Sequence, residues 1–175
     1  LLAGEMGIGN TTTSAALTAA LLERNPAELI GRGAGLSDEG LARKRCAVEK
    51  GLTLHKDLCG DALGLLSALG GFDLAALAGL MLGAAVEQIP LLLDGIITEA
   101  AALAAVSLAP GVRDYLFASH CSADPLAGAL LTALDLKPLI SAGLHLGEGT
   151  GAVAALPLLD MAEAVYSGAD SFTEL

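Results

Sequence analysis

Short apolar runs alternate with alanine- and leucine-rich segments along most of the chain, and this alternation limits the fold more than any other feature. We expect strands in the apolar runs at 1–3, 89–93, 115–119 and 138–142. We expect helices at 10–23, 37–54, 61–69, 73–87, 98–110, 125–134 and beyond 151. Strands that alternate with helices favour an α/β fold with a mostly parallel sheet, here one domain over 1–175.

Local signals refine the ends of these helices. Asn10 or Thr11 is the expected N-cap of the first helix, and Ser37 and Thr98 are expected to cap later ones. Pro157 falls inside the last helical segment, where a proline is expected to kink the helix or restart it.

The apolar residues make up 54% of the chain but form no segment typical of a membrane span. The longest apolar run, Leu74–Val86, ends at Glu87 and is shorter than the roughly 20 residues that a membrane helix needs. The chain begins without Met and without the pattern of a signal peptide. We therefore expect a cytoplasmic protein whose amino-terminal portion is missing, with Leu1–Ala3 as the end of a strand.

The formal net charge of −11 argues against nucleic acid as a partner, since phosphate backbones require a basic surface. The three cysteines lack CxxC spacing and fit a reducing compartment. Cys46, His55 and Cys59 would provide three zinc ligands, but no fourth lies nearby in the sequence. We therefore favour structural cysteines and expect neither a metal nor a cofactor.

Four polar or glycine-rich loops follow the expected strands. In open α/β sheets, ligands bind beyond the carboxyl ends of the strands, so we expect these loops to converge at one edge. They occupy 4–12, 94–95, 119–122 and 147–151.

The first loop and a basic cluster are the candidates for binding an anion. The loop holds three glycines ahead of a helix start, where exposed amides favour phosphate, although a simple tight turn explains the spacing equally well. Arg43, Lys44 and Arg45 cannot all face one site, because consecutive helical residues point about 100° apart. We expect Arg43 and Arg45 on a solvated face.

Two carboxylates lie within the glycine loops. Glu148, between two glycines, is either a general base or a charge that favours the helix N-terminus, and the second interpretation is the commoner one for an isolated loop. Glu5 is either an acidic site residue or an acceptor for loop amides. His120 and His145 are each expected to serve packing or a local hydrogen bond.

Together, the loops resemble nicotinate-nucleotide–dimethylbenzimidazole phosphoribosyltransferases. The resemblance covers essentially the whole chain, and several unusual motifs in series are more specific than any one loop. It rests on GEMGIGNTT at 4–12, GRGAG at 31–35, ARK at 42–44, IP at 89–90 before LDG at 93–95, SH at 119–120 before Ser122, and LGEGTGA at 146–152.

This resemblance implies a Rossmann-like three-layer α/β domain and a specific reaction. Nicotinate leaves C1′ of nicotinate mononucleotide, and a nitrogen of 5,6-dimethylbenzimidazole attacks from the opposite face, giving α-ribazole 5′-phosphate. Glu148 matches the proposed general base of the family, and Glu5 matches a second acidic position. The residues that would bind the substrates are Gly7, Ile8, Gly9, Asn10, Thr11, Thr12, Gly33, Lys44, Asp94, Gly95, Ser122, Leu146 and Gly147.

Two other interpretations stay open on the residues alone. The glycine loops also fit another phosphate-binding α/β enzyme, such as a sugar-phosphate kinase or isomerase. A truncated chain that folds without turnover is the second alternative, because family members carry an amino-terminal portion that supplies much of the benzimidazole pocket. The family further implies a homodimer, and the sequence leaves the preferred azole base undetermined.

Overall fold

The computed structural model describes residues 1–169. Its elements follow the expected α/β order, with short 3-10 helices (η) added between them. In chain order they are β1 (Leu2–Ala3), α1 (Asn10–Leu21), η1 (Pro26–Glu28), α2 (Asp38–Leu54), η2 (Lys56–Leu58), α3 (Ala62–Leu69), α4 (Phe72–Val86), β2 (Leu91–Leu93), α5 (Ile96–Leu108), η3 (Pro110–Tyr115), β3 (Leu116–Ala118), α6 (Leu126–Ala133) and α7 (Thr150–Gly168).

The sheet is parallel and has the order β1-β2-β3. Leu2 pairs with Leu92, and Leu91 pairs with Leu116. The strand expected at 138–142 is reduced to a single bridge between His120 and Ile140. Pro138 has no amide hydrogen to donate, so the ladder cannot extend through it.

Alternate side chains of β2 face the two helical layers that cover the sheet. Leu91 and Leu93 point into the large core formed with the helices, whereas Leu92 packs with Ala152 and Ala155 of α7. Successive side chains of a strand face opposite sides of a sheet, so one strand contacts both layers. The result is the expected three-layer α/β arrangement, with helices on one face and the first turns of α7 on the other.

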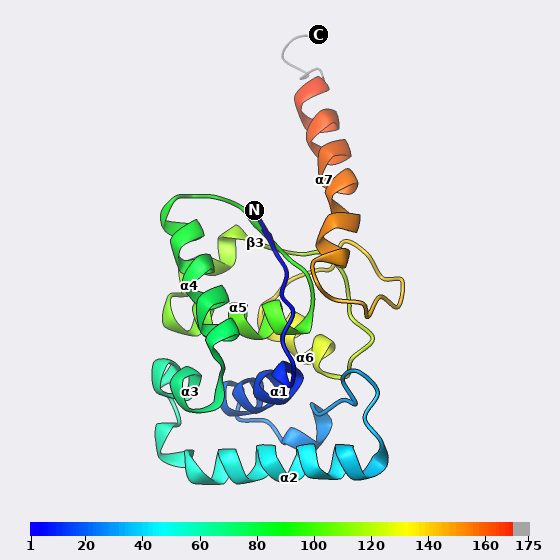
Figure 1. Ribbon diagram of the computed structural model, residues 1–175. Helices are drawn as coiled ribbons and strands as arrows, with labels where there is room; N and C mark the ends of the chain where they lie inside the picture. The colour runs from blue at the N-terminus through cyan, green and yellow to red at the C-terminus, as the bar shows by residue number, and fades with distance from the viewer. Residues whose placement is uncertain (170–175) are drawn as a thin grey trace.

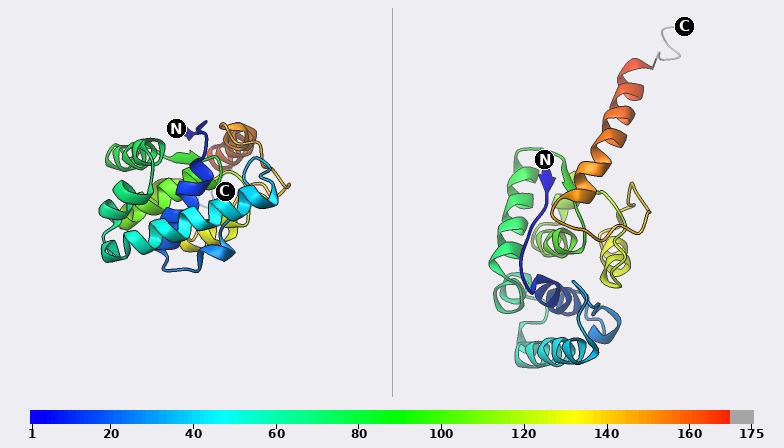
Figure 2. Two further views of the ribbon diagram at one scale, coloured as in Figure 1. Left: turned by 60° about the horizontal axis from the view of Figure 1, so that its bottom comes forward. Right: turned by 45° about the vertical axis from the view of Figure 1, so that its right-hand side comes forward.

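Helix α5 is the centre of the helical body. It packs against α1, α3, α4 and α6, and Ala100, Ala101, Ala102, Ala104 and Ala105 are fully buried in it. Small side chains on every side of this helix allow its neighbours to approach closely. Figures 1 and 2 show α4 and α6 on opposite sides of α5, with α1 between α5 and α2. Helix α7 projects from the end of the helical body that lies opposite α2 (Figure 1).

The structure corrects two of the expected helix caps. Helix α1 is preceded by Gly9 in the left-handed conformation, with φ 87°, and neither Asn10 nor Thr11 caps it. Both side chains are engaged elsewhere, with Glu5 and Lys44 respectively. Thr98 lies two residues inside α5, where its hydroxyl accepts from the Gly95 amide and donates to the Gly95 carbonyl.

Other local features follow the sequence more closely. Ser37 caps α2, as expected, by accepting from the Gly40 amide at 3.2 Å. Asp61 caps α3 in the same way through Gly64. Pro157 does not restart the last helix, because α7 continues through it. Across residues 1–169, every helix is either too short or too polar to traverse a bilayer.

Candidate functional site

Two glycine loops touch at the centre of the site. A Cβ added to Gly4 would lie 2.6 Å from both Cα and N of Gly149, closer than any real side chain tolerates. The backbones of the first and last loops therefore pack directly against each other. Because Glu5 follows Gly4 and Glu148 precedes Gly149, this contact brings the two carboxylates to neighbouring positions.

Glu5 lies in a partly buried, acidic environment. Its carboxylate accepts a hydrogen bond from the side-chain amide of Asn10. Burial is the largest cause that raises the pKa of Glu5, followed by the charge of Asp73 and, more weakly, those of Asp94 and Glu148, while the Asn10 bond opposes them. A carboxyl with a raised pKa is a better proton acceptor when it is ionised.

Glu148 is exposed and adopts a positive φ of 58° between two glycines that also have positive φ. A non-glycine residue in this left-handed region is uncommon and often marks a functional position. Its side chain lines a cavity together with the first glycine loop.

Asp73 is a site residue that sequence reasoning missed. It lies in the first turn of α4, and its Oδ2 would come within 3.1 Å of a Cβ on Gly7. Its charge raises the pKa of Glu5. A carboxylate at a helix start is common for reasons of helix electrostatics, so the sequence held no signal of this role.

Asp94 organises the last loop. Its carboxylate accepts from the amides of Gly149 at 3.0 Å, Gly151 at 2.8 Å and Ala152 at 3.1 Å. These are the amides that the start of α7 leaves without helical partners. The side chain that was expected to line the nucleotide site is thus also the anchor of α7 and, through Gly149, of the Glu148 loop.

Lys44 is buried, whereas Arg43 and Arg45 are exposed as expected. The Lys44 ammonium donates to Thr11 Oγ1 at 3.0 Å and to the Gly31 carbonyl at 2.9 Å. Burial lowers the pKa of Lys44, and the charge of Asp124 opposes that effect. Lys44 lies behind Thr11 and lines neither of the two cavities described next.

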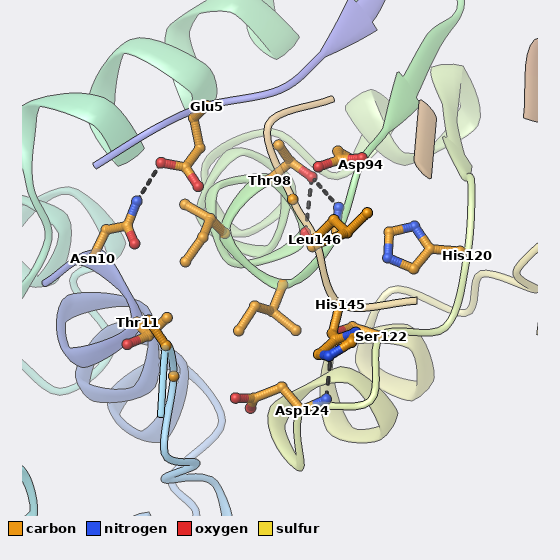
Figure 3. Close-up of a pocket in the computed structure, with 16 residues that line it drawn as sticks. Glu5, Asn10, Thr11, Asp94, Thr98, His120, Ser122, Asp124, His145 and Leu146 are labelled. Atoms are coloured by element: carbon orange, nitrogen blue, oxygen red, sulfur yellow. Dashed lines mark hydrogen bonds between the residues drawn. The ribbon is translucent and has the colours of Figure 1, made fainter. Parts of the chain in front are cut away.

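The smaller cavity measures about 230 Å³ and lies beyond the carboxyl end of β2. Figure 3 shows Glu5, Asn10 and Thr11 on one side of it and His120, Ser122 and His145 on the other. The lining consists of Glu5, Asn10, Thr11, Gly33, Ala34, Asp94, Gly95, Ile96, Ile97, Thr98, His120, Ser122, Asp124, His145, Leu146 and Gly147.

The larger cavity measures about 570 Å³ and opens over the first glycine loop. It adjoins the smaller one, because the two linings share Glu5, Asn10, Thr11, Ala34, Leu146 and Gly147. It adds exposed apolar side chains and Glu148. The lining consists of residues 5–12, Arg32, Ala34, Gly35, Leu36, Leu146, Gly147 and Glu148.

The structure brings together nearly all of the site residues expected from the sequence. Gly7, Ile8, Gly9 and Thr12 line the larger cavity, Gly33, Asp94, Gly95 and Ser122 line the smaller one, and Glu5, Asn10, Thr11, Leu146 and Gly147 line both. Of the expected site residues, only Lys44 lines neither cavity.

The possible zinc ligands do not form a site. Cys46 and Cys59 are both exposed, so the expectation of structural cysteines with buried side chains is wrong for these two. Within residues 1–169, no three His, Cys, Asp or Glu side chains are grouped closely enough to hold a metal ion.

Comparison with known proteins places the chain in a family. A family model described as "Phosphoribosyltransferase" matches residues 1–175. The nicotinate-nucleotide–dimethylbenzimidazole phosphoribosyltransferase of Acetivibrio thermocellus is 44% identical over 98% of this chain and 49% of its own length. The enzyme of the same name from Roseiflexus sp. is 47% identical over 99% of this chain and 49% of its own length.

A solved structure gives the same result for the fold. The crystal structure of CobT from Thermus thermophilus superposes with a TM-score of 0.93 at 48% identity, covering 99% of this chain and 52% of that one. The chain thus spans about half the length of the relatives that it matches. With a match over its full length and a common fold, the chain belongs to the phosphoribosyltransferase family that includes the nicotinate-nucleotide–dimethylbenzimidazole enzymes.

Proposed function

We propose that the protein containing this chain transfers the phosphoribosyl group of nicotinate mononucleotide to 5,6-dimethylbenzimidazole. The products are nicotinate and α-ribazole 5′-phosphate. The names of the relatives support this substrate pair. The observation that carries the proposal is the Gly4–Gly149 contact, which sets two carboxylates beside the start of a glycine-capped helix.

In this reaction the azole nitrogen attacks C1′ from the face opposite the departing nicotinate, so the configuration at C1′ inverts from β to α. The C1′–N bond to nicotinate breaks, and its electron pair stays on the pyridine nitrogen, which loses its positive charge. Bond formation makes the proton on the other azole nitrogen acidic. Glu148 takes this proton, and Glu5 assists the transfer by receiving it from Glu148.

The remaining groups bind and orient the substrates. The amides at the start of α1 face the nucleotide phosphate, supported from behind by the positive charge of Lys44. Asp94, Gly95 and Ser122 line the nucleotide end, in the smaller cavity. The azole occupies the larger cavity, where Met6, Ile8 and Leu36 offer apolar surface beside Glu148.

A product assay on the complete polypeptide tests this proposal. Incubation with nicotinate mononucleotide and 5,6-dimethylbenzimidazole should release nicotinate and form a nucleotide whose anomeric proton has the α configuration by NMR. Addition of ATP and Mg²⁺ should change nothing. Absence of the nucleotide product, or turnover only with ATP, would overturn the proposal in favour of another phosphate-binding enzyme or an inactive chain.

We also propose that the complete polypeptide is a homodimer, as the resemblance to the family implies. Helix α4 has two different sides. One side, with Leu74, Leu77 and Met81, is buried in the core of this chain. On the other side Leu80 and Val86 are exposed, and this is the part of the helix that supports a contact with a second copy. Sedimentation equilibrium should give twice the mass of the complete polypeptide. A monomer mass at working concentrations would refute the dimer.

A further inference from the structure

The buried histidine at the end of β3 has no role in the proton transfer described above. Ser119 and His120 are 0% and 2% exposed, and the backbone of His120 bridges to Ile140. The imidazole ring is enclosed by two glycines. A Cβ on Gly151 would lie 2.1 Å from its Nδ1, and one on Gly95 would lie 3.4 Å from its Cε1.

The hydrogen bonds of Ser119 determine the tautomer of this ring. The Ser119 hydroxyl donates to the Asp94 carbonyl at 2.9 Å and lies 2.9 Å from His120 Nδ1. A hydroxyl has one hydrogen, which the carbonyl oxygen already takes. Nδ1 must therefore carry its own hydrogen and donate to Ser119, which leaves Nε2 of the neutral ring as an acceptor.

The environment favours the neutral ring. Burial lowers the pKa of His120, and the nearby charge of Asp94 opposes this effect without reversing it. Nε2 has no hydrogen-bond partner within residues 1–169, and the ring lines the smaller cavity. In Figure 3 the ring extends from its strand end toward Leu146 and the interior of the site.

Chemistry limits what this acceptor can bind. Nicotinate mononucleotide carries a carboxylate, a largely dianionic phosphate and a quaternary ring nitrogen, none of which donates a hydrogen bond. Its ribose hydroxyls are its donors. The azole also carries an N–H, but Glu148, its proposed partner, lines only the larger cavity, whereas His120 lines only the smaller one.

We propose that His120 accepts, through Nε2, a hydrogen bond from a ribose hydroxyl of the bound nucleotide and thereby selects ribose over deoxyribose. This inference rests on the proposed function. It assigns a role in specificity to the Ser119–His120 pair, with Gly95 and Gly151 providing the space for the ring.

Two matched variants of the complete polypeptide test the inference by calorimetric titration with nicotinate mononucleotide and its 2′-deoxy and 3′-deoxy analogues. The unmodified protein should bind one analogue about five- to tenfold more weakly than the parent, the loss expected for one hydrogen bond. His120→Asn retains a donor for Ser119 but lacks a group at the Nε2 position, and should reduce this ratio to within about twofold. His120→Gln places an oxygen near that position and should retain discrimination.

The outcomes separate the two proposals. If the unmodified protein binds nicotinate mononucleotide without discriminating, or if His120→Asn still discriminates, the role of His120 is wrong and the proposed function stands. If the unmodified protein binds none of the three nucleotides, the proposed function itself fails.

A measurement on the unmodified protein is independent of how the variants fold. Nitrogen-15 and carbon-13 labelling of the complete polypeptide assigns the His120 ring through its backbone, and this chain contributes three of the histidines. Nε2 of His120 should have the shift of an unprotonated nitrogen and should move toward the protonated value when nicotinate mononucleotide binds. An unprotonated Nδ1, or an Nε2 signal unchanged at saturation, would contradict the inference.

Discussion

Lys44 is a cation whose surroundings determine what it can do for an anionic substrate. An ammonium has three donors, and Thr11 Oγ1 and the Gly31 carbonyl take two of them. Because Lys44 lines neither cavity, it acts on a bound phosphate through its charge or through a bridging water. This buried positive charge, together with that of Arg32 in the wall of the larger cavity, offsets part of the formal net charge of −11.

We predict that Lys44→Met weakens the binding of nicotinate mononucleotide by about ten- to a hundredfold, because a unit charge at about 8 Å contributes about 2 kcal/mol at an effective dielectric constant of about 20. Methionine keeps most of the buried aliphatic stem. Calorimetric titration measures the dissociation constant, and Lys50→Met, at an exposed position of the same helix, is the control. An unchanged dissociation constant in Lys44→Met would show that Lys44 does not contribute to binding the phosphate.

Glu99 is a buried carboxyl in the first turn of α5, and its Oε2 has no partner within residues 1–169. Burial, and secondly the charge of Asp94, raises the pKa of Glu99 to about 8 from a reference value of 4.5. The folded protein therefore retains a proton that the unfolded chain releases. The contribution of the protonated group to stability is complete below pH 4.5 and is lost as the pH rises through about 8.

We predict that Glu99→Gln stabilises the protein increasingly as the pH rises from about 5 to about 8, by up to about 1.4 kcal/mol per pH unit. Thermal melts at several pH values measure the difference in Tm between variant and parent. Glu87→Gln, at an exposed site, should show no such trend. A difference in Tm for Glu99→Gln that does not grow with pH would show that the carboxyl is already charged in the folded state.

At the scale of elements, the site depends on how closely two loops approach. Gly4 meets Gly149 without any side chain between them, and Asp94 ties the same loop to the end of β2 through three amides. The relative positions of Glu5 and Glu148 therefore follow from backbone packing rather than from a direct bond between them.

We predict that Gly4→Ala lowers kcat by about a hundredfold, because a shift of roughly 1 Å in catalytic geometry has an effect of that size. The added methyl would lie 2.6 Å from the Gly149 backbone, so the loops must separate. Gly79→Ala is the control, since nothing lies within 4 Å of its added Cβ on α4. Steady-state kinetics on both variants measure kcat. A kcat for Gly4→Ala equal to that of the parent would mean that the loop contact does not position the carboxylates.

The sequence predicts the elements better than their contacts. The Ser37 cap and the glycine loops are local, and local hydrogen-bonding chemistry identifies them, although it misplaced the caps of α1 and α5. The bonds from α7 to Asp94 join residues 55 or more positions apart, and the space that Gly151 leaves for His120 depends on packing between separate elements. No spacing rule reports such contacts. The family motifs included Ser119 and His120, and a local hydrogen bond was expected for His120, whereas the role of Asp73 and the enclosure of the His120 ring by Gly95 and Gly151 came only from the structure.

At the scale of the whole molecule, a small parallel sheet brings its loops together at one edge, and the helical body packs around α5. The chain spans about half of its relatives' length, and the two cavities open where glycine loops and strand ends meet. We propose that this edge holds an anionic nucleotide beside a glycine-flanked carboxylate that accepts the azole proton.

The substitution Glu148→Gln in the complete polypeptide tests this claim most directly, with nucleotide binding and turnover measured on the same preparation. Glutamine has the same shape and cannot accept the proton as a base. We predict a dissociation constant for nicotinate mononucleotide within about twofold of the parent and a kcat reduced by about 10²–10⁴-fold, the usual range for losing a general base. Turnover equal to that of the parent would contradict it.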